Sequence, residues 1–182
     1  MVSFEFDEKR VSQVCAHIIQ KSKGRINYTK LLKILYLIDR EALKLWNHSL
    51  TGDTPVSMDN GPVLSRIYNH IKGVASSTSN YWSQFISTDG YDVRLMREPE
   101  VDEISPADLE IIDSVYEIYK DYPYTKLIDI CHELPEWVNP NGSSTPIYFE
   151  TIFKHLQKDE ALVKSIDFEQ QSHQKVKKIL NC

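Results

Sequence analysis

Apolar residues recur every three or four positions in two early stretches, which is the spacing of an amphipathic helix. The first stretch predicts a helix that begins near Asp7, a residue type that caps helix N-termini, and ends near Gly24. The second runs from about Asn27 to Trp46, and its apolar side chains cover most of the helix circumference. Because such a helix lies in the centre of a fold, we expect residues 29–46 to be the most buried element.

The next part of the chain mixes extended and helical signals. Val56 and Met58 alternate with polar residues and predict a short extended segment, after which Pro62 is expected to open a third helix that ends near Lys72. Residues 73–80 are rich in serine and predict a surface loop.

Two aromatic or alternating runs, at residues 81–86 and 91–96, flank the dipeptide Asp89-Gly90. An Asp-Gly pair between such runs is typical of a tight turn between antiparallel strands. We therefore predict a small antiparallel β element over residues 81–96.

Helical signals resume after this element. Ser105 followed by Pro106 is a typical helix start, and a short helix is expected over residues 125–133. Pro146 is expected to open a further helix that ends at Leu156. Together these patterns predict a mainly α-helical compact domain over residues 1–182, with residues 157–182 forming a C-terminal helix that is peripheral to the body.

Length, composition and charge fit this picture. At 182 residues, with 41% hydrophobic and 26% charged residues, the chain suits one globular domain. The net charge of −5 hides an asymmetry, because residues 1–50 carry nine Lys/Arg against five Asp/Glu and the remainder twelve against twenty-one. The acidic remainder suits a partner with a basic surface. General nucleic-acid binding is not expected, although a local basic patch in the first two helices stays open.

The cysteines and the lengths of the apolar runs indicate the cellular compartment of the protein. Cys15, Cys131 and Cys182 are widely spaced and form no C-x-x-C pair, which favours single thiols in a reducing compartment. The N-terminus lacks the features of a secretory signal, and no apolar run approaches the roughly 20 residues of a membrane span. We expect a cytoplasmic protein without a membrane partner.

The residues give no positive support for catalysis. His132-Glu133 begins like a zinc-protease helix, but Glu136 stands where the second histidine would be. Cys131 and His132 are adjacent, so on a helix their side chains diverge by about 100° and cannot act as nucleophile and base. We expect neither enzyme activity nor a cofactor nor a metal site.

Five residues are candidates for contact with a partner protein. Met58, Asp59 and Arg66 flank the Gly-Pro corner, while Tyr81 and Trp82 lie on the predicted hairpin; anchors of this kind are typical of interfaces. Two plainer interpretations remain open: the corner only joins a strand to a helix, and the aromatic pair covers the core. Base stacking by the aromatic pair is a further alternative.

Several segments, taken in order, resemble a known family. They read KILYLIDR at residues 33–40, NGPVLSRIY at 60–68, a serine-led helix start at 104–109, and LIDICHELPEW at 127–137. This order is similar to that of the Panacea domain of SocA-like antitoxins. The resemblance implies a small, mainly helical antitoxin that neutralises a cognate toxin by direct protein contact and carries no catalytic residues. Most of the matched positions, such as Tyr36, Gly61 and Trp137, are implied to define the fold.

The resemblance leaves two other functions open. One is an adaptor that delivers the toxin to a protease, and the other is a phage-associated nucleic-acid-binding protein. The chain shows no added DNA-binding module, which departs from antitoxins that repress their own operon.

Overall fold

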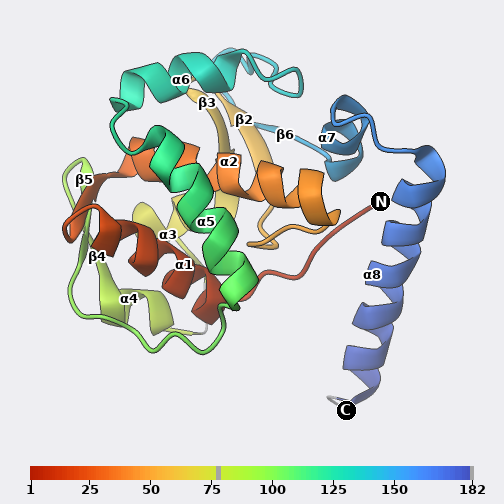
Figure 1. The fold of residues 1–182 in the computed structure, drawn as a ribbon, viewed down its shortest axis with the longest axis horizontal. Coiled ribbons are helices and arrows are strands. Elements are labelled where there is room, and N and C mark those ends of the chain that lie inside the picture. Colours follow the sequence, from red (N-terminus) through yellow and green to blue (C-terminus); the bar gives the residue numbers. More distant parts are fainter. Residues whose placement is uncertain (77–78, 181–182) are drawn as a thin grey trace.

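A long central helix, α2 (Tyr28–Trp46), organises the structure, a computed structural model that describes residues 1–76 and 79–180 (Figure 1). Every residue from 31 to 39 is buried, which confirms that this is the most buried helix. Leu45 and Trp46, at its C-terminal end, are exposed instead. The helix begins as expected, because the Asn27 side chain accepts a hydrogen bond from the Lys30 amide.

Other helices pack around α2. Among them are α1 (Glu8–Lys21), α3 (Ser65–Ile71), α5 (Pro106–Tyr119) and α6 (Tyr124–His132). The predicted caps are confirmed: Asp7 accepts a hydrogen bond from the Arg10 amide at the start of α1, and Ser105 and Asp108 cap α5 reciprocally. The mainly α-helical prediction is therefore confirmed.

Two small antiparallel sheets complete the body. The first has the strand order β1-β5-β4 and contains β1 (Arg25–Asn27), β4 (Ile86–Asp89) and β5 (Asp92–Leu95). The second has the order β3-β2-β6 and contains β2 (Pro55–Met58), β3 (Gly61–Leu64) and β6 (Thr145–Pro146). The predicted β4–β5 hairpin is present, and Asp89 pairs with Asp92 across its turn.

The first strand of that hairpin was predicted too early. Residues 81–85 form a short helix, α4 (Tyr81–Phe85), and only then does β4 begin. The reason is the spacing of the apolar residues: Trp82 and Phe85 are three positions apart, so one helical face buries both of them.

Two predicted helix starts were also wrong. Pro62 and Pro146 lie in β3 and β6, the two edge strands of the second sheet, where a residue without an N–H group is tolerated. Helix α3 begins only at Ser65, where the carboxylate of Asp53 accepts hydrogen bonds from the amides of residues 66 and 67. Helix α7 (Phe149–His155) likewise begins after Pro146.

A second, smaller core lies at the C-terminal side. Val2 and Phe4 of the N-terminal segment pack with Phe149, Phe153 and Ile166. Helix α8 (Glu160–Leu180) stands beside the body (Figure 1). Hydrogen bonds from Met1 to Asp167, from Gln174 to Ser3 and from Lys177 to Glu5 join it to the N-terminal segment. Cys182 and residues 77–78 of the predicted serine-rich loop lie outside the described residues. Within the described residues, no helix is long and apolar enough to span a membrane.

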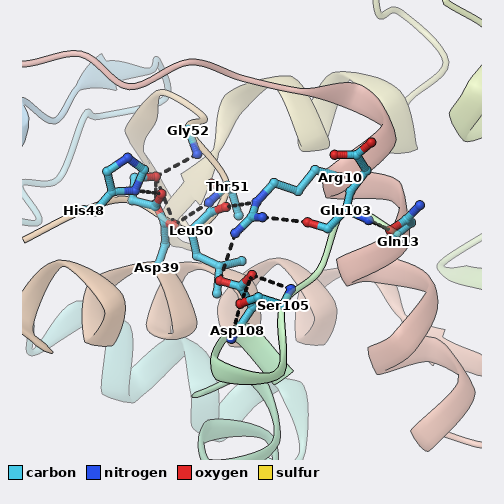
Figure 2. A network of polar contacts seen from close by, with 11 residues as sticks. Arg10, Gln13, Asp39, His48, Leu50, Thr51, Gly52, Glu103, Ser105 and Asp108 are labelled. Carbon is cyan, nitrogen blue, oxygen red and sulfur yellow. Dashed lines mark hydrogen bonds and ion pairs between the residues drawn. The ribbon is translucent and has the colours of Figure 1, made fainter. Parts of the chain in front are cut away.

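A polar network fixes the loop that follows α2 (Figure 2). The guanidinium of Arg10 donates to the carbonyl oxygens of Leu50 and Glu103 and to the carboxylate of Asp108, at 2.6–3.0 Å. The buried carboxylate of Asp39 accepts hydrogen bonds from the Ser49 hydroxyl and from the amide of residue 51. These contacts join α1, α2 and α5 to the loop that leads into the second sheet.

We expect Arg10→Ala to destabilise the protein by about 2–4 kcal/mol, because it leaves a nearly buried carboxylate and two carbonyl groups without their donor. The measurement is the free energy of unfolding in urea. Lys9→Ala is the matched control, because Lys9 lies next in α1 but pairs with Asp102 at the surface. Equal losses in both variants would contradict the role given to Arg10.

A second prediction concerns pH. Burial raises the pKa of Asp39 from its ordinary 3.8 to about 6, although the hydrogen bonds it accepts oppose the shift. Since the folded state binds this proton more tightly than the unfolded state, protonation of Asp39 stabilises the fold as the pH falls through 6 towards 4. Relative to Asp39→Asn, the wild type should gain about 1 kcal/mol in unfolding free energy between about pH 7.5 and pH 5. A parallel pH profile in the two proteins would show that Asp39 does not titrate this way.

Candidate functional site

The tight turn between β2 and β3, residues 58–62, is held in place by side chains from elsewhere in the chain, and we call it the corner. The indole N–H of Trp137 donates to the carbonyl oxygen of Met58 at 3.0 Å, and Nε2 of His132 lies 2.9 Å from the carbonyl oxygen of Asp59. The rings of His132 and Trp137 stack with centroids 4.1 Å apart. The end of α6 and the segment after it therefore clamp one side of the corner.

A buried lysine clamps the other side. The Lys33 side chain comes from α2, is 1% exposed, and donates from Nζ to the carbonyl oxygen of Pro62 at 2.8 Å. Burial lowers the pKa of Lys33 to about 8. Burying an ammonium group lowers the stability of the fold unless the group is well paired. The contact that fixes this turn therefore carries a desolvation penalty.

Glycine suits the apex of the corner for two reasons. Gly61 has φ +91°, a backbone conformation that other residues adopt only with strain. A Cβ atom there would also lie 3.2 Å from Cβ of Cys131 and 3.3 Å from Nζ of Lys33, so these neighbours would have to shift by a few tenths of an ångström. A side chain at this position therefore disturbs the contact between the corner and Lys33.

Glu136 connects the clamp to the centre of the fold. Its carboxylate is buried and accepts hydrogen bonds from the Tyr36 hydroxyl at 3.1 Å and from Nε of Arg40 at 2.7 Å. Both donors lie on α2, so the position of the neighbouring Trp137 is set by the central helix.

A pocket of about 220 Å³ opens beside the corner. It is smaller than sites that hold drug-sized ligands, and its size suits a single inserted side chain. Met58, Asp59 and Gly61 line one wall, and Tyr28 and Tyr68 lie at another. The remaining lining residues are Thr29, Leu32, Lys33, Asn60, Val63, Gly142 and Ser143.

Three tyrosines and a lysine form a surface next to this pocket, which we call the tyrosine face. The rings of Tyr28 and Tyr91 stack with centroids 6.2 Å apart, and Tyr91 is 76% exposed. Nζ of Lys72 lies 4.1 Å from the centroid of the Tyr28 ring and 5.6 Å from that of Tyr68. The hydrogen bond from Lys72 to the Tyr28 hydroxyl raises the pKa of the lysine, which stays charged. Tyrosines with an attached cation are typical anchors of protein interfaces.

The five partner-contact residues proposed from sequence do not form one surface. Met58 and Asp59 lie at the corner and line its pocket. Arg66 lies at the opposite end of the β2–β3 hairpin, with its guanidinium 5.0 Å from the Phe6 ring centroid. Tyr81 is half-buried and Trp82 is only 5% exposed, so α4 turns both toward the body.

Trp82 and Arg66 belong instead to one column of stacked groups. The Trp82 ring stacks on His70 at 5.3 Å, His70 stacks on Phe6 at 6.2 Å, and Arg66 covers Phe6. This column packs the N-terminal segment against α3 and α4. The interpretation of Trp82 as a core residue fits its burial.

The tyrosine face itself was missed by sequence reasoning. Tyr28 and Tyr91 meet because β1 pairs with β5, where Asn27 lies opposite Asp92. The amide of Tyr28 also donates to the carbonyl oxygen of Tyr91. Only that long-range pairing brings the rings together, and it has no local signature in the sequence.

The described cysteines are poorly placed for nucleophilic chemistry. Cys15 and Cys131 are fully buried, and burial raises the pKa of both thiols, that of Cys131 to about 11. In residues 1–76 and 79–180, no group of three or more His, Cys, Asp or Glu side chains is placed to hold a metal ion.

A model of the SocA-like antitoxin family with the Panacea domain matches residues 31–138, more than half of the chain. The chain belongs to this family. No curated protein and no solved structure matches it. The matched part of the Panacea domain contains Lys33, the corner, His132 and Trp137, so the clamped corner lies wholly within it, whereas Tyr28 lies just before it.

We expect Gly61→Ala to destabilise the Panacea domain by about 2 kcal/mol more than Gly90→Ala. Both glycines have positive φ, at +91° and +61°, but a Cβ at Gly90 meets nothing within 4 Å. The difference therefore reports the crowding against Lys33 and Cys131 together with the greater backbone strain at φ +91°. The measurement is chemical unfolding of both variants, and equal losses would show that the corner tolerates a side chain.

Proposed function

We propose that this protein is the antitoxin of a toxin–antitoxin pair and that it neutralises its cognate toxin by direct binding rather than by catalysis. Membership of the SocA-like antitoxin family supports the general function. The toxin is proposed to contact the tyrosine face and to insert one side chain into the adjoining corner pocket.

The observation that carries this choice of surface is the exposed aromatic cluster. Tyr91 is 76% exposed although it is a large apolar ring, and it is already ordered by stacking on Tyr28. A rigid, exposed aromatic group loses little conformational entropy when it is covered by a partner. Met58, half-buried at the adjoining pocket, adds an apolar anchor.

The construction of the corner supports the same conclusion. Its backbone is fixed by a buried lysine, an indole and an imidazole, which is more than a simple connection between two strands needs. Pre-organisation of a contact surface reduces the free-energy cost of association. A fixed shape of the corner for a partner would give a reason for burying Lys33 despite its desolvation penalty.

The decisive experiment is co-expression. Each open reading frame next to this gene is expressed alone and together with the protein, and cell growth is followed. We expect one product to arrest growth alone and to be relieved by this chain, with which it co-purifies. If neither neighbour is toxic and relieved, the antitoxin proposal is wrong.

The same experiment separates the two alternative functions. If toxin levels fall only in cells with an active protease, the chain acts as an adaptor. If the protein acts by binding nucleic acid, its association constant for nucleic acid should fall steeply as the salt concentration rises. Constant toxin levels together with a stable complex support direct neutralisation.

Tyr91→Asp and Met58→Asp should each weaken toxin binding by about tenfold or more, because each places a charge at a covered apolar anchor. The unfolding midpoint of Tyr91→Asp should stay near that of the wild type, since Tyr91 is exposed, whereas Met58 packs against the main core and the folded fraction of its variant is checked before the titration. Tyr148→Asp is the matched control: this tyrosine is 50% exposed at the start of α7, away from the corner. Binding is measured by titration with the purified toxin from the co-expression screen.

Arg66→Glu distinguishes the two ends of the β2–β3 hairpin. We expect it to leave toxin binding unchanged, because Arg66 lies on the column with Phe6 and not at the corner. If Arg66→Glu abolishes binding while Tyr91→Asp does not, the toxin docks at the opposite end of the hairpin.

A further inference from the structure

A second surface pocket, of about 490 Å³, gathers basic side chains from four separate elements. Lys21 and Lys23 come from the end of α1 and the turn after it, Arg25 from β1, Lys30 from α2 and Lys120 from the residue after α5. We call this the basic pocket. Four of its five cations belong to the first fifty residues, so four of the nine Lys/Arg of that part of the sequence meet at this pocket.

The carboxylates around the basic pocket compensate only part of this charge. Lys21 pairs with Asp113 at 3.0 Å, Lys120 pairs with Glu117, and Arg25 pairs with Asp92. None of these three acids lines the pocket. The one carboxylate in its lining is Asp121.

Lys23 and Lys30 form no ion pair with any carboxylate of the described residues. Nζ of Lys30 donates to the backbone carbonyl of Lys120, and burial lowers the pKa of Lys30, with a small opposing effect from Asp121. A nearby anion stabilises a partly buried ammonium group, because its attraction offsets the desolvation of the charge. Lys23 is exposed and can reach the same anion.

Lys23 lies in the turn after α1 with a left-handed backbone. Its φ is +64°, a conformation that glycine or asparagine adopts more easily than lysine. The next residue, Gly24, is also left-handed, at +81°. Replacement of Lys23 by glycine is therefore compatible with this turn.

We propose that the basic pocket binds a small ligand that carries a chain of phosphate groups, such as a nucleoside triphosphate or a free polyphosphate. Adjacent phosphates present several negative charges to the several cations that line this pocket, and lysine and arginine are the side chains that bind phosphate. The volume of about 490 Å³ lies in the range of small-molecule sites. This site is separate from the corner and does not depend on the toxin.

The test uses isothermal titration of the full chain with tripolyphosphate, ATP and inorganic phosphate at near-physiological salt. We expect tripolyphosphate to bind and inorganic phosphate to bind at least tenfold more weakly. ATP binding as tight as tripolyphosphate or tighter assigns the site to a nucleotide, whereas weaker ATP binding assigns it to a free polyphosphate. No binding of either at millimolar concentration overturns the proposal.

The variant Lys23→Gly with Lys30→Gln removes both cations without an ion-pair partner. Glycine suits the left-handed backbone at position 23, so the fold is retained and the unfolding midpoint confirms it. We expect tripolyphosphate affinity to fall at least tenfold, since two charge-assisted contacts are lost. The matched control is Lys164→Gln with Lys175→Gln, which removes the same charge from exposed positions of α8. Equal weakening in both double variants would show attraction by net charge only and would also overturn the proposal.

Discussion

The hydrogen bond from the buried ammonium of Lys33 to the carbonyl oxygen of Pro62 is the contact on which the corner depends. It links the central helix to the second sheet beside Gly61, whose missing side chain leaves room for the ammonium. Trp137 and His132 then close the opposite side of the turn, and Glu136 ties that segment back to α2. Lys33 together with these side chains sets the relative positions of α2, the corner and the segment after α6.

Local chemistry made much of this fold predictable. Asp7, Asn27 and Ser105 are helix caps that each bind the amide three positions further along the chain, so their helices began where expected. The start of α3 depends instead on Asp53, twelve residues before Ser65, and a proline between them suggested an earlier start. Likewise, an aromatic run favours a strand on composition, but the three-residue spacing of Trp82 and Phe85 places them on one helical face.

The candidate site was predictable only in part, for the same reason. Met58 and Asp59 were found because the Gly-Pro corner has a local signature. Tyr28, Tyr68, Tyr91 and Lys72 converge through strand pairing and helix packing, and nothing near each residue indicates its neighbours. Side chains that meet through tertiary packing, without a shared motif, can be identified as one surface only from the structure.

The prolines that misled the helix prediction have a consequence for association. Both outer strands of the second sheet, β3 and β6, carry one, and a proline offers no N–H group to a further strand. Another chain that paired with either edge would lack a backbone hydrogen bond at the proline. The toxin contact that we propose beside the corner would then rely on side chains, which discriminate between partners, rather than on the backbone, which every polypeptide shares.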